Sequence, residues 1–531
     1  MRRKFKSYFI NLTVPAVVFG SITGVLVGVV VTFFRWCAAH AMRLSEYLYG
    51  VIRGNFLWLI AAVAVFFGVS VAFSRIYKAM PIVGGGGIPT SIGILRGVLT
   101  FKWLKTLICT SVMSLTVLVS GVPLGSMGAA VQIGTALGKG SVSVAKKHTA
   151  WQRYCMTGGA CASFTLATGA PISGILFAVE EAHQRISPMI VMVSSISVIM
   201  ARLTTEMLSP TLELSIGLFP EMQLQRLTLS EVWIPLLVGL VMGVFAVFFL
   251  MYYRGIKHFF NHTLRRVPHS AKIFSVFMLT LIFGTLSFSF ISTGRELIVS
   301  LIAQRPAWWM LIALLLVRST VTISASTNRL TGGLFLPVLS VGVVVAAMLG
   351  EGLVTILGLS HVYYDTVLML GIAACISGAM KMPLTAIIFS VEALSCYENI
   401  LYVIIASGVS FVITEIFELK SVDENVLAAR VEEMNNDKEQ TVIDTFVTVR
   451  EGSFAVDKQI RDIFWPANLF VLSVKHDETR KAEVDEHGGK TLRVGDILHV
   501  RYSTYDPVSA RDELIAIVGI QEYDESAADL I

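Results

Sequence analysis

The apolar part of this chain is written twice, and this duplication limits its fold more than any other feature. The segment 171–180 (PISGILFAVE) returns as 383–392 (PLTAIIFSVE), 212 residues later at both ends. Upstream residues return at a similar spacing in three pairs, Gly20 and Gly239, Gly24 and Gly243, and Arg35 and Arg254. Duplicated membrane halves are typical of transporters that bind a solute near the bilayer midplane. The repeat therefore predicts a membrane protein that moves a solute.

The composition also indicates an integral membrane protein. Of the 531 residues, 54% are hydrophobic and only 15% are charged, far from the composition of a soluble domain. The segments 9–34 and 232–253 contain no charged residue, and each exceeds the roughly 20 residues that cross a bilayer. Three other apolar stretches, 57–74, 107–124 and 334–350, are shorter or broken by Gly and Pro. We expect these three to be partial or re-entrant helices.

The expected fold is an all-α polytopic membrane protein with a small α+β domain behind it. The membrane domain covers 1–430, with repeats at approximately 10–215 and 230–420. From 431 to 531 charge increases and short alternating segments appear at 442–449, 469–474 and 497–502, a pattern typical of strands. If each copy crosses the membrane an odd number of times, the second copy is inverted relative to the first.

Charge near the N-terminus predicts the orientation. The first nine residues, MRRKFKSYF, carry four Lys or Arg, which favours a cytoplasmic N-terminus and, with an even number of spans, a cytoplasmic C-terminal domain. No small-residue cleavage site follows, so we expect no removed signal peptide. We expect the plasma (inner) membrane of a prokaryote. The net charge of +5 is modest for this length and does not predict a nucleic-acid partner.

Three glycine-rich breaks precede apolar helical segments, at 84–89 (GGGGIP), 121–128 (GVPLGSMG) and 331–337 (TGGLFLP). Glycine lets successive backbone N–H groups converge, and a helix N-terminus carries about half a positive charge. Such breaks attract small anions without a buried cation. The alternative is that the glycines only form tight turns or close helix contacts.

Two other function classes fit the sequence less well. A cation uptake protein needs converging carbonyls or carboxylates, and the sequence has no TVGYG-like string. An intramembrane enzyme needs a nucleophile or a metal constellation such as HExxH, which is absent here, and the six cysteines lack metal-ligand spacing. We therefore expect no catalytic residues, no metal and no cofactor.

The order and spacing of these motifs resemble the CLC family of chloride channels and chloride/proton antiporters. The strings that carry the resemblance are GGGIP, GSMGAAVQIG, APISGILFAVEE, GGLFLP and MPLTAIIFSVE, and the similarity covers roughly residues 10 to 430. It implies an inverted repeat of tilted, partly re-entrant helices in the lipid bilayer. It also implies a homodimer with one pathway per subunit for chloride or a similar small anion.

The resemblance implies an anion pathway that departs from the family pattern at two positions. Gly86 stands where the family has a serine that contacts the central chloride. Met127 stands at the gate position, where the family has a glutamate that accepts a proton. The positions matched to the pathway are Gly85, Gly86, Gly87, Ile88, Ser126, Met127, Gly128, Leu334 and Phe335.

Four acidic residues have expected roles. Glu181 matches the family's internal proton glutamate, with a cytoplasmic vestibule contact as the alternative. Asp423 falls near the family's pore-lining tyrosine, and we expect it to be solvated at the inner mouth. Because Glu180 and Glu392 occupy equivalent positions in the two copies, we expect both to accept hydrogen bonds from a neighbouring helix.

Met127 cannot ionise, so the family's route of proton coupling lacks its gating acid. The sequence therefore predicts a chloride channel or an uncoupled transporter. The alternative is a proton-coupled chloride or fluoride antiporter with an unconventional gate.

The tail resembles a TrkA-C-type (RCK C-terminal) regulatory domain, mainly through the phrase RVGDILHV at 493–500. The resemblance implies dimerisation and regulation by a small ligand such as a cyclic dinucleotide. The alternative is a tail that only stabilises the dimer.

Overall fold

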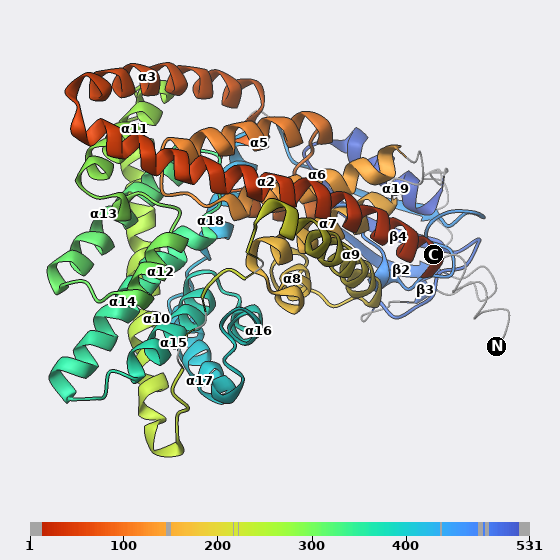
Figure 1. The fold of residues 1–531 in the computed structure, drawn as a ribbon. Coiled ribbons are helices and arrows are strands. Elements are labelled where there is room, and N and C mark those ends of the chain that lie inside the picture. Colours follow the sequence, from red (N-terminus) through yellow and green to blue (C-terminus); the bar gives the residue numbers. More distant parts are fainter. Residues whose placement is uncertain are drawn as a thin grey trace.

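The structure, a computed structural model, describes residues 13–144, 150–215, 217–220, 222, 224–435, 438–475, 482–483 and 488–519. The N-terminal basic residues used above to predict orientation lie outside these ranges. Within them the chain forms a large assembly of tilted helices, and a small sheet lies beside α7 and α9 (Figure 1).

The first repeat contains eight α-helices in the described residues: α2 (Val14–Gly54), α3 (Phe56–Ala79), α4 (Gly87–Leu95), α5 (Trp103–Val119), α6 (Ser126–Val144), α7 (Ala150–Thr168), α8 (Pro171–Phe177) and α9 (Pro188–Leu212). A π-helical turn, η3 (Ala178–Ala182), continues α8. The helices α8 and α9 begin at proline, whose fixed φ suits the first helical position.

The second repeat follows the same order in the described residues: α10 (Trp233–His258), α11 (His269–Leu286), α12 (Arg295–Ala303), α13 (Trp308–Thr327), α14 (Phe335–Leu357), α15 (Tyr363–Ala379), α16 (Pro383–Leu394) and α17 (Ile400–Ile416). Equivalent helices pack in equivalent pairs, because α2 contacts α9 as α10 contacts α17, and α6 contacts α7 as α14 contacts α15. The predicted helical inverted repeat is therefore the observed fold.

The repeated glycines have a packing reason. A Cβ on Gly24 of α2 would lie 2.5 Å from the Ser197 carbonyl oxygen of α9, and a Cβ on Gly239 of α10 would lie 2.7 Å from the Ala406 carbonyl oxygen of α17. Small residues let helix backbones approach closely in membranes. Each repeat therefore has a close backbone contact between its first and last helices, at glycines that are not counterparts, because Gly24 returns as Gly243.

Eight helices in the described residues are long and apolar enough to cross a membrane. The segments 57–74 and 334–350, predicted to be partial, belong to helices α3 and α14 of 24 and 23 residues, which extend beyond the predicted segments and are long enough to cross a bilayer. The polar ends extend these helices: α3 starts from the Asn55 cap and runs past Arg75 and Lys78. The segment 107–124 lies in the shorter α5, which ends at Val119.

The C-terminal part begins with α18 (Val422–Asn435), which packs against α4. A four-stranded antiparallel sheet follows, in the order β1-β4-β2-β3, with β1 (Thr441–Thr448), β2 (Leu469–Lys475), β3 (Ala482–Glu483) and β4 (Ile497–Thr504). The three predicted strands correspond to β1, β2 and β4. The last helix, α19 (Pro507–Val518), packs its Leu514 and Ile517 into the core beneath the sheet.

Candidate functional site

Each glycine-rich break ends where a helix begins. The first leads to α4, whose N-cap is Gly86; the second leads to α6 at Ser126; the third leads to α14, whose N-cap is Leu334. The first N–H groups of a helix have no partner within that helix. Three such helix starts therefore supply free or ligand-accessible donors.

These three helix starts meet at the centre of the membrane domain. Gly125 and Gly333 lie 208 residues apart and occupy equivalent positions in the two repeats. They exchange two backbone hydrogen bonds, of 2.8 Å and 2.6 Å. A Cβ on Gly128 would lie 2.5 Å from the Gly333 Cα, and a Cβ on Gly87 would overlap the Gly128 carbonyl. We call Gly87, Gly125, Gly128 and Gly333 the glycine crossing.

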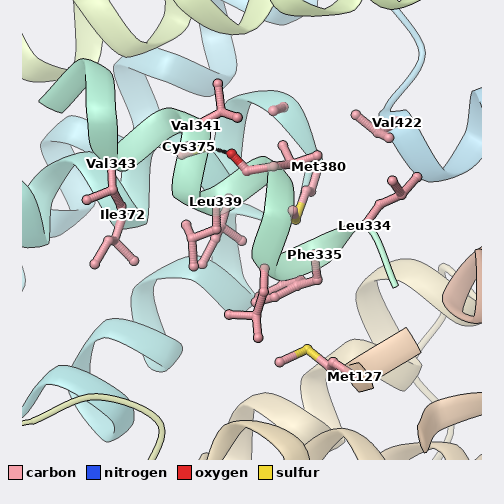
Figure 2. Packing of buried hydrophobic residues seen from close by; sticks show 14 of the residues in the cluster. Met127, Leu334, Phe335, Leu339, Val341, Val343, Ile372, Cys375, Met380 and Val422 are labelled. Atoms are coloured by element: carbon pink, nitrogen blue, oxygen red, sulfur yellow. Dashed lines mark hydrogen bonds between the residues drawn. The ribbon is translucent and has the colours of Figure 1, made fainter. Parts of the chain in front are cut away.

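Apolar side chains fill the space around the glycine crossing. Met127 of α6 and Phe335 of α14 lie across from each other (Figure 2), and they are 1% and 2% exposed. Ile88 and Leu334 are also buried. The Phe335 ring is edge-on to the Phe164 ring, with centroids 5.6 Å apart. We call these four buried side chains, of Ile88, Met127, Leu334 and Phe335, the apolar plug.

One cavity reaches this plug from the side of α2. Its volume is about 270 Å³, and Ser126 and Met127 form part of its wall. Its charged lining residues are Arg35, Arg43, Arg295, Glu46 and Glu296. Basic side chains outnumber acidic ones, so this cavity, which we call the outer cavity, favours anions over cations.

A second cavity reaches the first glycine-rich break from the side of α18. Its volume is about 330 Å³, and Gly85 forms part of its wall. Its charged lining residues are Lys257, Arg329, Arg430, Glu432 and Glu433. We call this second cavity the inner cavity. Gly85 precedes Gly87 by two residues, so the inner cavity and the outer cavity adjoin the same glycine crossing.

The repeated glutamates cap each other's repeat. Glu392 accepts hydrogen bonds from the Ile172 and Ser173 amides, at 2.8 and 2.9 Å, and from the Ser173 hydroxyl. Glu180 accepts the equivalent three bonds from Leu384 and Thr385. These amides lie in the first turns of α8 and α16, where donors lack helical partners. The predicted shared structural role is confirmed.

Glu181 and Asp423 are both buried, at 4% and 5% exposed, and they lie within electrostatic range of each other. One carboxylate oxygen of Glu181 is buried without a hydrogen-bond partner among the described residues. The expectation that Asp423 is solvated is wrong, because α18 packs its first turn against the membrane domain. That position at a helix N-terminus favours a carboxylate.

The turn after Glu181 contacts the C-terminal domain. The Phe464 ring lies 4.3 Å from the Tyr154 ring and 4.5 Å from the His183 ring, between centroids. Ser187 donates a 3.0 Å hydrogen bond to the Asp462 carboxylate. We call this set of contacts the domain seam.

Sequence reasoning missed the basic residues of both cavities and the domain seam. Arg295 is followed by Glu296, and Arg430 by Glu432 and Glu433, so neither arginine stands out in the sequence. Only the folded chain brings the two arginines to cavity walls. In the described residues, no group of three or more His, Cys, Asp or Glu side chains can hold a metal ion.

Comparison with known proteins identifies the family. The profile of the voltage gated chloride channel family matches residues 67–415, more than half of the chain.

Three solved structures share the fold. A slow cyanobacterial Cl⁻/H⁺ antiporter has a TM-score of 0.71 and 21% identity, and the match covers 79% of this chain and 99% of that one. A eukaryotic CLC transporter has a TM-score of 0.63 and 16% identity, covering 85% and 78%. A CLC-type fluoride/proton antiporter has a TM-score of 0.61 and 18% identity, covering 76% and 96%.

At these sequence identities the similarity to the solved structures shows only a shared fold. The match to the family profile shows that the chain is a member of the family. The chain therefore belongs to the CLC family of voltage gated chloride channels, and transport of a small anion across a membrane is its activity at that level.

Proposed function

We propose that this chain moves chloride, or a similar small anion, without obligatory exchange of protons, as a channel or an uncoupled transporter. The observation that carries the proposal is Met127, which stands between the outer cavity and the glycine crossing. A thioether side chain is flexible and polarisable but cannot carry a proton. Met127 therefore closes the pathway by its bulk and opens it by changing rotamer.

Backbone donors bind the anion in this proposal. The amides of Ser126, Met127 and Gly128 begin α6, and those of Leu334 and Phe335 begin α14. Their donors and the two helix dipoles point toward one region. The substitution of methionine for glutamate changes a side chain and leaves these amides in place.

A proton-coupled chloride or fluoride antiporter is the second candidate. Glu181 favours it, because a buried carboxylate with an unpaired oxygen is a candidate proton carrier in a membrane protein. In that case another group replaces Met127 as the acceptor on the outer side.

Flux measurements on purified protein in liposomes separate the two candidates. Under the proposal, the wild-type protein releases chloride whether or not a proton gradient is imposed, and a chloride gradient drives no uphill proton movement. Uphill proton movement in the wild-type protein would support the antiporter and overturn the proposal. In Met127→Glu, chloride release falls as pH rises, because the ionised carboxylate competes with the anion for the same donors.

We also propose that the protein is a homodimer in a prokaryotic inner membrane, with both termini in the cytoplasm. In this proposal the C-terminal domain is a TrkA-C-like regulatory module that binds a small ligand such as a cyclic dinucleotide.

The contacts of Arg153 and Arg96 support regulation. Arg153 of α7 binds the Glu513 carboxylate of α19 at 2.8 Å, and its guanidinium fills the space where Gly97 would carry a Cβ. The neighbouring Arg96, at the end of α4, donates to the Glu181 carbonyl at 2.8 Å. A movement of α19 would therefore reach α4 and the Glu181 turn. Deletion of the residues after 435 should abolish any response of flux to candidate nucleotides.

A further inference from the structure

We propose that the corner where α3 ends and α11 begins binds the phosphate headgroup of an anionic phospholipid from the surrounding membrane. Four basic residues form this corner, which we call the basic corner: Arg75 and Lys78 of α3, and Arg265 and Arg266 just before α11. The inference goes beyond the proposed anion transport, because the lipid is a partner of the outer surface of the protein and not a solute that crosses it.

Packing between α3 and α11 brings the parts of the basic corner together (Figure 1). The Tyr77 ring of α3 lies 6.1 Å from the His269 ring of α11, between centroids. Lys78 follows Tyr77 directly, and Arg266 precedes His269 by three residues. The basic residues of α3 and those before α11 therefore lie at the same end of the two helices.

The turn between α10 and α11 carries positive charge that no acidic residue of the same stretch balances. From 232 to 295 the chain has six Lys or Arg residues and no Asp or Glu. Glu433 of α18 lies within electrostatic range of His269, but it pairs with Arg329. The turn is therefore a concentrated patch of positive charge between two membrane helices.

The side chains of the basic corner have no partner within the described part of the protein. All four are exposed, and none makes a hydrogen bond or an ion pair with another described residue. Lys272, in the first turn of α11, instead donates a 2.8 Å hydrogen bond to the Phe260 carbonyl, which ties the turn to α11. The basic corner is thus held in place while its own donors stay available for a ligand.

The corresponding stretch of the first repeat, 35–53, uses its arginines differently. Arg35 donates to the Ser215 carbonyl at 3.1 Å, and Arg53 donates to the Thr285 carbonyl at 2.8 Å. The same stretch contains Glu46. The first repeat therefore satisfies its arginines within the protein, whereas the second repeat presents Arg265 and Arg266 to the outside.

The apolar surface of α3 favours a lipid as the occupant. Only 17% of the apolar part of α3 is buried within the protein, and Val65 and Phe67 of this helix are 60% and 58% exposed. A phospholipid whose chains cover α3 places its headgroup where the apolar surface ends, beside Arg75 and Lys78. Basic residues next to a membrane helix attract anionic headgroups, and a guanidinium binds phosphate through two parallel hydrogen bonds. The apolar surface and the basic corner together fit one lipid molecule.

Native mass spectrometry of the full-length protein in detergent tests this assignment by counting bound lipids. Phosphatidylglycerol, which is anionic, and phosphatidylcholine, which has no net charge, are added at equal concentrations. We expect the wild-type protein to bind phosphatidylglycerol more tightly. The double variant Arg265→Gln/Arg266→Gln should bind it about 25-fold more weakly, because each basic residue at an anionic lipid surface contributes about fivefold. Binding of phosphatidylcholine should not change.

Lys102→Gln/Lys105→Gln is the matched control. These two lysines are also exposed at the end of a membrane helix, α5, but they lie outside the basic corner, so phosphatidylglycerol binding should not change. An equal loss of binding in the two double variants would show a general effect of charge and overturn the inference. Unchanged binding in the Arg265 and Arg266 variant, or equal binding of the two lipids by the wild-type protein, would also overturn it.

The same samples distinguish a lipid from other occupants of the basic corner. Inorganic phosphate at the concentration of the lipid should not displace bound phosphatidylglycerol, and displacement would make a soluble phosphate the occupant and overturn the lipid assignment. The spectra also report the number of subunits, which should be equal in the wild-type protein and the Arg265 and Arg266 variant. Loss of a dimer in that variant would assign the corner to a second copy of the chain and likewise overturn the inference.

Discussion

The two repeats share the same helix packing and differ in the contacts that their unmatched residues make. Glu180 and Glu392 make the same three hydrogen bonds in opposite directions. Glu181, one residue further, has Ala393 as its counterpart, and the contacts of the domain seam fall on the first repeat. Residues that recur hold the two halves together, whereas residues without a counterpart mark where the halves have taken different tasks.

The largest effect should come from a change at the glycine crossing. In Gly333→Ala the new Cβ would lie 2.4 Å from the Gly128 backbone nitrogen and 2.9 Å from the Gly128 Cα. Both are backbone atoms, so the repeats must separate. We expect a loss of about 3 kcal/mol in the free energy of unfolding, the upper end for overpacking. Thermal unfolding in detergent, followed by size-exclusion chromatography, measures it.

Gly408→Ala is the control for this substitution. A Cβ on Gly408 of α17 would meet nothing within 4 Å, and alanine favours a helix over glycine by about 1 kcal/mol. Equal melting temperatures for the two alanine variants would contradict a tight crossing.

Substitutions of the two repeated glutamates should reduce the free energy of unfolding by less than Gly333→Ala, and by equal amounts. In Glu180→Gln or Glu392→Gln the amide nitrogen faces backbone donors, so each variant should lose about 1–3 kcal/mol in the free energy of unfolding. Glu181→Gln should lose nothing, because it neutralises a buried carboxylate that has an unpaired oxygen. The same thermal assay compares the three. A Glu181 variant as unstable as the other two would erase the distinction between recurring and unmatched residues.

Lys458 should make the stability of the C-terminal domain, which is not duplicated, depend on pH. Burial lowers the pKa of its ammonium from 10.5 to about 8, while the unfolded chain keeps the ordinary value. Between these values the unfolded chain binds more protons, so stability rises with pH, by about 1 kcal/mol per unit at most. Melting temperatures between pH 7 and 9.5 should show this rise, and Lys458→Met should flatten it. A rise of the same slope in Lys458→Met would exclude Lys458 as its source.

The smallest effect concerns the ion pair beside the domain seam. Glu513→Gln removes the ion pair with Arg153, whose side chains are 12% and 41% exposed, and such a pair contributes up to about 1 kcal/mol. Backbone amides at 183–187 should exchange hydrogen faster in this variant.

Glu206→Gln is the matched control for that measurement. It removes the exposed Arg202 pair within α9, and it should leave exchange at 183–187 unchanged. Equal exchange rates in the Glu513 and Glu206 variants would show that the seam does not depend on Arg153.

The repeat and the glycine-rich breaks could be predicted because they are local patterns. Gly20 returns as Gly239 and Gly24 as Gly243, and each of them lies in a close contact between the first and last helices of its repeat. The lining of the inner cavity could not be predicted in this way. Arg430 binds the Pro81 carbonyl across 349 positions, and no local pattern records a contact between such distant residues. Asp423 was misplaced for the same reason, since its burial depends on where α18 packs.

The exchange of hydrogen bonds between Gly125 and Gly333 has a consequence for how such a chain can change over generations. Each residue is the counterpart of the other and donates a hydrogen bond to it, so a change in the backbone of one repeat alters the contact of the same residue in the other repeat. The centre must therefore keep its symmetry while the periphery diverges. In a duplicated protein of this type, residues far from the crossing can change in one repeat alone, whereas residues at the crossing can change only together.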